Sequence, residues 1–323
     1  MAQERLAIGI DIGGTAIKSG VISESGAVLK HEDTLSPAAE GREAMLAALR
    51  DTGRRWLADP DIDAKRIAGI GVDTPGCVDE TGTVVSEVVR IENWTGTPIA
   101  AVMAREFGLP AAADNDVNAM CYAEWRIGSA RGRRHVACIT LGAGVGGALV
   151  IDGRIHRGAA SFAGEIGHMV IAKDGPQCGC GRRGCFEAYV GAKPITEQAQ
   201  WAIRLGADTD IIEHAGGVLE RVTPEVVFAA AKKGDRVALG IADEVARCIA
   251  VALGNILNVL DPDTFVIGGG IAQAGEILFD AVRRHLVVEA LPRVPPPVVV
   301  PAQLGNDAGV IGSAMLALDS PQA

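Results

Sequence analysis

The chain lacks an excess of positive charge and any long uninterrupted apolar run. It has 40 Asp and Glu against 30 Lys and Arg residues, a net charge of −10, which argues against nucleic acid or an anionic membrane as its main partner. Its apolar stretches are broken by Gly, Asp or Asn well short of a membrane span. No basic segment leads into an apolar stretch near the start, so we expect no signal peptide and a cytoplasmic location.

Two common signatures of nucleotide binding are also missing. No Gly-Lys dipeptide occurs anywhere in the chain, so a Walker A loop is excluded. The stretch "GAGVGG" at 142–147 formally matches the dinucleotide-binding fingerprint, but that fingerprint needs a helix after the glycines. Here "ALVIDG" continues as a β-rich segment. If a nucleotide binds, neither the Rossmann nor the P-loop arrangement applies.

The 323 residues, 48% of them hydrophobic, are enough for two cores, because domains cluster around 100–150 residues. Residues 5–23 are predicted to form two strands around a Gly-Gly turn, and 133–155 repeat that arrangement. Between and after them we predict strands at 27–35, 67–73 and 109–114, and helices at 38–58, 97–108, 117–128 and 236–260. Alternating elements of this kind indicate two α/β domains packed across a cleft.

Each predicted hairpin turns on a glycine loop, "DIGGT" in the first half and "LGAGVGGA" in the second. Glycine lets backbone N–H groups approach a ligand closely, as phosphate-binding loops require. Either loop alone reads as a tight hairpin turn, whereas the two together favour phosphate binding. Asp11 beside the first loop could hold Mg²⁺ through water or cap its own turn.

Three polar residues, Asp114, Asn115 and Asp116, stand at a predicted strand end just before a helix. One such residue suffices to cap the helix. The carboxyl end of a strand is also where α/β enzymes place substrate groups, and a carboxylate there could act as a general base. For Asp116 the sequence alone leaves cap and catalyst open.

Three of the seven cysteines fall within eight residues, with a histidine upstream. The spacing H-x9-C-x-C-x4-C predicts a closed, tetrahedral structural zinc site formed by His168, Cys178, Cys180 and Cys185. The C-x-C spacing does not suit a thioredoxin-like redox pair. Such a zinc site would hold the flanking carboxylates of Glu165 and Glu187 in place. Their oxygens can accept hydrogen bonds from the hydroxyls of a sugar.

Together the motifs "DIGGTAIK", "DNDVNA", "LGAGVGG", "AGEIGH", "CGCGRRGCFE" and "DPDTFVIGGGIA" resemble the ROK family of bacterial sugar kinases and repressors. The resemblance runs from Leu6 to about Gly312. It implies an actin-like ATPase fold, related to ribonuclease H, with two α/β domains closing over a central cleft. It places a small domain at 1–118, joined by a C-terminal helix at about 306–323, and a large domain with the zinc loop at 119–305.

The resemblance also implies an ATP-dependent sugar kinase, most simply a glucokinase that phosphorylates the C6 hydroxyl with Mg²⁺ as cofactor. Asp116 would be the general base. The further sugar contacts would be Gly76, Asn115, Glu165, His168 and Glu187. The residues that bind ATP would be Asp11, Gly13, Gly14, Thr15, Lys18, Gly142, Gly144, Gly146, Gly147, Gly269 and Gly270.

This chain departs from the family pattern at two positions: Ala143 stands where a Thr is usual, and Asp114 where a Glu is usual. Neither change removes the proposed base. The family's repressors carry an N-terminal helix-turn-helix, for which the early first strand leaves no room, so we expect none. Family members are commonly dimers or tetramers, and the resemblance implies a homodimer or homotetramer with no nucleic-acid partner.

Overall fold

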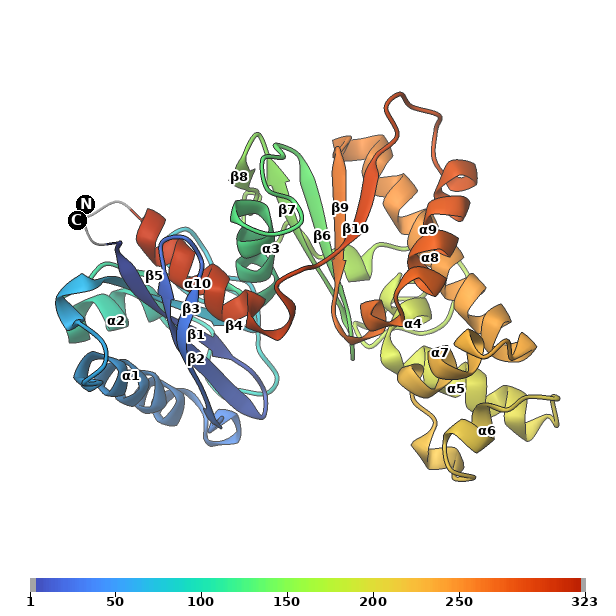
Figure 1. Ribbon diagram of the computed structural model, residues 1–323, viewed down its shortest axis with the longest axis horizontal. Coiled ribbons are helices and arrows are strands. Elements are labelled where there is room, and N and C mark those ends of the chain that lie inside the picture. The colour runs from blue at the N-terminus through green and yellow to red at the C-terminus, as the bar shows by residue number, and fades with distance from the viewer. Residues whose placement is uncertain (1–3, 321–323) are drawn as a thin grey trace. The chain divides into compact units, whose positions relative to one another are not determined.

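The computed structural model describes residues 4–320, which group into two compact units (Figure 1). The first unit consists of residues 4–132, Ile155–Ala163 and 303–320. The second consists of Arg133–Arg154 and Gly164–Ala302. Each unit is built on a five-stranded sheet. The domain boundaries expected from the sequence, at residues 118 and 305, stay a prediction.

The first sheet contains the hairpin expected around the first glycine turn. Its strands are β1 (Leu6–Ile12), β2 (Ala16–Ser23), β3 (Val28–Leu35), β4 (Ile67–Thr74) and β5 (Ala111–Asn115), in the order β3-β2-β1-β4-β5. The strands β1, β2 and β3 pair antiparallel, whereas β4 and β5 are added parallel to β1. The carboxyl ends of β1, β4 and β5 therefore meet at one edge.

Helices cover both faces of this sheet. The helices α1 (Arg42–Ala58) and α2 (Ile99–Phe107) share one apolar cluster with Ile8, Ile10 and Val72. On the other face, α3 (Asp116–Arg126) and α10 (Ala308–Asp319) pack together over Ala7 and Ile22. Because both faces are covered, β1 and β4 are apolar along nearly their whole length.

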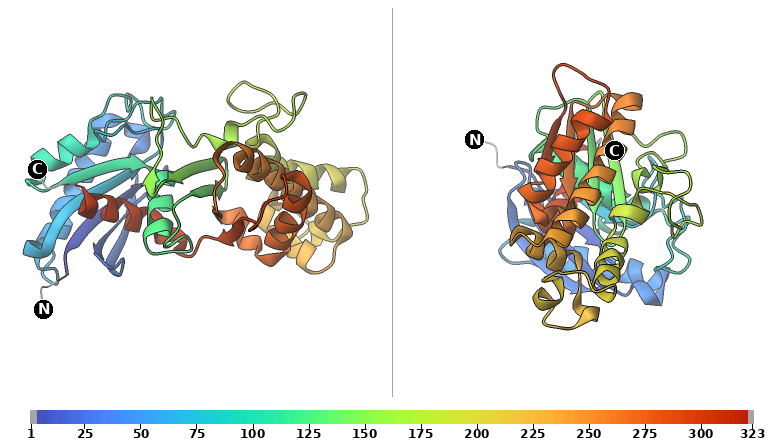
Figure 2. Two further views of the ribbon diagram at one scale, coloured as in Figure 1. Left: turned by 90° about the horizontal axis from the view of Figure 1, so that it is seen from above. Right: turned by 90° about the vertical axis from the view of Figure 1, so that its right-hand side faces the viewer.

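Glycine on the sheet lets α10 lie almost directly on the strands (Figures 1 and 2). A Cβ built on Gly9 would run into the carbonyl of Val310, and one built on Gly71 into the carbonyl of Ser313. This close approach brings the N-terminal turn of α10 to the edge where β1 and β4 end, since a Cβ built on Gly309 would lie 3.0 Å from Asp11 Oδ2 and 3.1 Å from Asp73 Oδ2.

The second sheet repeats the hairpin, as the duplicated glycine turns predict. Its strands are β6 (Val136–Leu141), β7 (Val145–Ile151), β8 (Arg154–Ile155), β9 (Thr264–Gly268) and β10 (Val298–Pro301), in the order β10-β9-β6-β7-β8. The pair β6–β7 is antiparallel, and β9 and β10 are added parallel to β6. The strand β7 begins inside "GAGVGG", at Val145, and continues beyond it, so the helix that a dinucleotide fingerprint needs is not there.

The second unit is rich in helices. They are α4 (Glu187–Val190), α5 (Ala192–Arg204), α6 (Ile211–His214), α7 (Pro224–Lys232), α8 (Arg236–Leu260) and α9 (Glu276–Glu289). The longest, α8, has the bounds expected from its pattern and begins at the cap residue Asp235, whose side chain accepts from Ala238 N at 2.7 Å. Within residues 4–320 no helix is both long and apolar enough to cross a bilayer.

Candidate active site

The turn between β5 and α3 decides which residue caps α3, a role that the sequence left open for Asp116. Asn115 is the helix cap, because its Oδ1 accepts from Val117 N at 2.9 Å and from Asn118 N at 3.1 Å. Its Nδ2 donates to Asp116 Oδ1 at 2.8 Å and to the carbonyl of Gly76 at 3.0 Å. The cap residue thus orients the Asp116 carboxylate and ties it to the loop after β4.

The pKa of Asp116 is raised to about 6, mainly because its carboxyl is buried. The N–H of Val117 opposes this shift, and the nearby charge of Asp11 adds to it. A carboxyl group with this pKa is ionised at neutral pH, yet takes up a proton more readily than an exposed aspartate. Those are the properties a general base needs.

Asp114 stabilises the turn between β5 and α3 and is almost fully buried, with 1% of its surface exposed. It accepts from Asn118 Nδ2 and from Asn115 N, both at 2.8 Å, and forms an ion pair with Arg157. Sequence reasoning missed Arg157 and Asn118. Asn118 lies in the first turn of α3, where the sequence could have indicated a polar residue with a role in the turn. Arg157 comes 43 positions after Asp114, and no local sequence signal connects the two.

The first glycine loop follows β1. Gly13 N donates to the carbonyl of Ala16 at 2.9 Å, which closes the turn, while Gly14 and Thr15 are exposed. A Cβ built on Gly14 would lie 2.5 Å from Nη1 of Arg90. The loop therefore offers exposed backbone next to a guanidinium group that the sequence analysis did not select. Lys18 on β2 donates to the carbonyl of Asn306 at 3.2 Å.

The second glycine loop, 142–147, follows β6 and runs into β7, which begins at Val145. It lies beside the third glycine group. Gly269 has a positive φ of 88°, and a Cβ there would collide with the backbone of Leu141, so only glycine fits. The loop itself is held by Gly142 N, which donates to the carbonyl of Gly144 at 3.0 Å. Gly270 follows at the start of a short 3-10 helix.

The cysteine loop gathers the four predicted ligands. The nitrogen and sulfur atoms of His168, Cys178, Cys180 and Cys185 all lie within 4.8 Å of one another. Cys178 Sγ is 3.7 Å from His168 Nδ1, and Cys180 Sγ is 3.6 Å from Cys185 Sγ. Bonds of about 2.3 Å from zinc to sulfur put tetrahedral ligands about 3.8 Å apart. The cluster therefore has the size that a zinc ion requires.

Glu187 joins this cluster to the second glycine loop. Its Oε2 accepts from Val145 N at 2.9 Å, and Cys178 Sγ lies 3.8 Å from its Oε1. A Cβ built on Gly144 would come within 2.6 Å of the same Oε2. The Glu187 carboxylate is thus fixed between the cysteine cluster and the second glycine loop. Glu165 is exposed and directly precedes the short 3-10 helix that carries His168.

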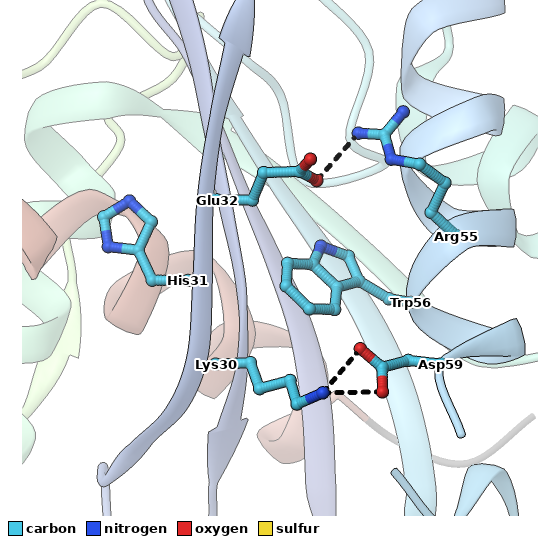
Figure 3. A pocket seen from close by; sticks show the side chains of 6 residues that line it. All are labelled: Lys30, His31, Glu32, Arg55, Trp56 and Asp59. Atoms are coloured by element: carbon cyan, nitrogen blue, oxygen red, sulfur yellow. Dashed lines mark hydrogen bonds and ion pairs between the residues drawn. The ribbon is translucent and has the colours of Figure 1, made fainter. Parts of the chain in front are cut away.

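A hollow of about 490 Å³ on the first unit is a competing location (Figure 3). Its charged side chains already neutralise one another: Lys30 Nζ binds Asp59 at 2.7 Å, and Arg55 binds Glu32 at 3.1 Å. Trp56, which also lines the hollow, donates to Ser19 Oγ at 2.9 Å. Because these groups are satisfied within the protein, we do not place the active site there.

Comparison with known proteins identifies the family. The profile described as "ROK family" matches residues 7–320. The chain belongs to the ROK family. The glucokinase of Thermotoga maritima is 32% identical to this ROK protein over 310 residues, which cover 96% of each chain. The xylose repressor of Caldicellulosiruptor bescii is 28% identical over 277 residues, 85% of this chain and 68% of the repressor.

A solved structure extends the comparison to three dimensions. The ROK family glucokinase of Streptomyces griseus, crystallised with glucose and AMPPNP, is 30% identical. It superposes with a TM-score of 0.81 over 98% of this chain and 100% of that one. The predicted actin-like ATPase fold is therefore confirmed for this ROK protein.

Each unit thus gathers part of the predicted site. The first contains Gly76, Asn115, Asp116 and the loop from Asp11 to Thr15, and the second contains the cysteine cluster, Glu165, Glu187 and the remaining glycines. Hydrogen bonds connect Gly76, Asn115 and Asp116. That the two groups bind one sugar and one nucleotide stays a prediction.

Proposed function

We propose that this ROK protein transfers the γ-phosphoryl group of ATP to the C6 hydroxyl of a hexose, most simply glucose. An ATP-dependent sugar kinase is supported by the relatives above, which include full-length glucokinases. The observation that carries the proposal is the carboxylate of Asp116, which Asn115 orients at a strand end and which is only partly exposed. Asn115 caps the helix, and the hydrogen bonds that Asp116 accepts from Asn115 Nδ2 and Val117 N both go to its Oδ1.

In the proposed reaction the C6 oxygen attacks the γ-phosphorus while the bond from that phosphorus to the bridging oxygen of ADP breaks. Asp116 accepts the hydroxyl proton, so the products are the sugar phosphate, ADP and the protonated carboxyl group. Backbone N–H groups of the two glycine loops, which are exposed at Gly14, Thr15 and Ala143, would hold the phosphates, and Mg²⁺ brought with ATP would neutralise their charge. Catalysis would come from positioning and charge stabilisation.

We also propose that His168, Cys178, Cys180 and Cys185 hold a structural zinc ion. Four ligands fill the tetrahedron, so no position remains for water or substrate. Since Nδ1 of His168 faces Cys178, the other ring nitrogen would be available to a sugar hydroxyl. The ion would fix Glu187 and the histidine for sugar binding. The protein would act in the cytoplasm as a homodimer or homotetramer, which light scattering can test.

A sugar sensor without turnover is the second candidate. It is favoured by the similarity to a xylose repressor and by Ala143, which removes a hydroxyl from the second glycine loop. It is disfavoured by the intact "DIGGT" loop and by Asp116, which ligand binding alone does not need. Among kinases, N-acetylmannosamine, N-acetylglucosamine and fructose are the alternative substrates.

A kinetic screen of these sugars with ATP tests the proposal. We expect the highest kcat/KM for glucose and weaker turnover of the N-acetyl sugars. Equal turnover of glucose and an N-acetylhexosamine would overturn the assignment as a glucokinase, whereas the assignment as an ATP-dependent sugar kinase would stand. Binding of a sugar without any release of ADP would establish the sensor instead.

The pKa of Asp116 predicts how the activity depends on pH. A general base works only when ionised, so kcat/KM should be constant above the pKa of about 6 and fall by about tenfold per unit at lower pH. A cation beside Asp11 favours the ionised form and would move this limb to somewhat lower pH. The measurement is a pH–rate profile at saturating ATP and Mg²⁺. A flat profile down to pH 4.5, well below that value, would contradict the role of Asp116.

A further inference from the structure

One arginine of the first unit lies against the first glycine loop. A Cβ built on Gly14 would lie 2.5 Å from Nη1 of Arg90, 3.4 Å from its Cδ and 3.6 Å from its Cζ. Gly14 is not among the glycines with a positive φ, so its backbone conformation does not require glycine. What the missing side chain provides is the space in which the guanidinium group of Arg90 lies.

The backbone that carries Arg90 is anchored at the carboxyl end of β4. Ile91, the next residue, is 2% exposed and belongs to an apolar cluster of the first unit, and its N–H donates to the carbonyl of Val88 at 3.3 Å. Trp94 is also buried, and its Nε1 donates to Oγ1 of Thr74, the last residue of β4, at 2.9 Å. Arg90 is therefore an exposed side chain on a fixed backbone, next to the edge where β1 and β4 end.

Arg90 has no anionic partner in the described part of the protein. Within residues 4–320 its side chain takes part in no hydrogen bond or ion pair. By contrast, Arg157 forms an ion pair with Asp114, and Lys18 stands in register with Asp11 and donates to a backbone carbonyl at 3.2 Å. The five N–H donors of Arg90 therefore remain available to an anion that binds at the first glycine loop.

The anion nearest to Arg90 would be the phosphate group that is transferred. The first glycine loop follows Asp11, and the charge of Asp11 helps to raise the pKa of Asp116, so the loop begins close to the proposed base. In the proposed reaction the C6 oxygen lies between that base and the γ-phosphorus. A phosphate group at Gly14, beside Arg90, is therefore placed for the transfer.

We propose that Arg90 is a further catalytic residue, which binds the γ-phosphoryl group beside Gly14 and neutralises the charge on its oxygens during the transfer. This inference rests on the proposed kinase function. A planar guanidinium group can donate two parallel hydrogen bonds to phosphate oxygens, and arginine side chains stabilise the transition state of phosphoryl transfer in this way. The bonds formed and broken are those of the proposed reaction. Arg90 transfers no proton, because its guanidinium group stays charged.

Kinetics and nucleotide binding of Arg90→Ala test this role. With the preferred sugar and saturating MgATP, kcat should fall roughly 10²–10³-fold. In calorimetry without sugar, the affinity for MgAMPPNP should fall more than that for MgADP, because only AMPPNP carries a γ-group. Sugar affinity should stay that of the wild type. Arg90→Lys keeps the charge but cannot donate two parallel hydrogen bonds, so it should recover only part of the lost kcat.

The matched control is Arg105→Ala, which removes the same charge from an exposed position. Arg105 lies in the last turn of α2, which leads into the amino end of β5 and hence to the edge of the sheet opposite Gly14. This variant should keep the kcat of the wild type.

Gly14→Ala tests where the guanidinium group acts. The added methyl group would displace it, so kcat should fall in the wild-type background and change little further in Arg90→Ala. The inference is overturned if Arg90→Ala keeps kcat within a few fold of the wild type, or loses affinity for AMPPNP and ADP equally. Equal effects of Gly14→Ala in both backgrounds would also overturn it. In each of these cases the wild type still phosphorylates the sugar, whereas failure of the proposed function would leave the wild type itself without turnover.

Discussion

Asp116→Asn is expected to lower kcat for sugar phosphorylation roughly 10²–10⁴-fold, the usual contribution of a positioned base. The amide keeps the shape of the carboxylate, and its oxygen can still accept from Asn115 Nδ2 and Val117 N. The turn should therefore remain folded. Sugar affinity should change by only a few fold, because the lost function is the uptake of a proton in the transition state.

Calorimetry of sugar binding and a coupled assay for ADP measure the two effects separately. A suitable control is Asp63→Asn, since this exposed residue only caps a short 3-10 helix through a hydrogen bond to Lys65 N, which asparagine can also accept. It should retain full activity. If Asp116→Asn turned over within a few fold of the wild type, another group would have to be the base.

Cys180→Ala is expected to release the zinc ion and to weaken sugar binding strongly. The thiol is exposed and contributes little to the core, so its removal acts through the metal. Without the ion, the loop that carries Glu187 and His168 must be ordered when sugar binds, which costs affinity. Glu187 also accepts from Val145 N in the second glycine loop. ATP affinity should therefore fall too, but less than sugar affinity.

Metal analysis of the purified protein and calorimetry with sugar and with AMPPNP test this expectation. The wild type should contain about one zinc per chain. Cys248→Ala is the matched control, because this cysteine lies on α8 in the same unit but outside the cluster. A Cys180→Ala protein without zinc that binds sugar as the wild type does would show that the loop does not shape the pocket.

The parts of this account that sequence alone predicted depend on short-range signals. The two glycine turns predicted the hairpins β1–β2 and β6–β7, and the periodic pattern of 236–260 predicted α8 with its bounds. The cysteine spacing predicted which four side chains come together. In each case the residues that interact are near one another in the chain, so spacing determines geometry.

The remaining features depend on contacts between distant segments. Asp73 belongs to a strand that the sequence predicted, but its burial follows from the order of β1, β4 and β5 and from the close packing of α10 on glycine. The ion pair of Arg157 with Asp114 joins segments 43 positions apart. The sequence also could not decide which residue caps α3, because Asn115 and Asp116 are both good caps and only the backbone path selects one.

Identification of the reaction product is the most direct test of the proposed function. The wild-type protein is incubated with ATP, Mg²⁺ and glucose, and the mixture is followed by phosphorus NMR with detection of coupling to protons. The account predicts ADP and a sugar phosphate in equal amounts, with the new phosphorus signal coupled to the C6 methylene protons. Unchanged ATP, or ADP with inorganic phosphate and no phosphorylated sugar, across glucose and the alternative hexoses would contradict it.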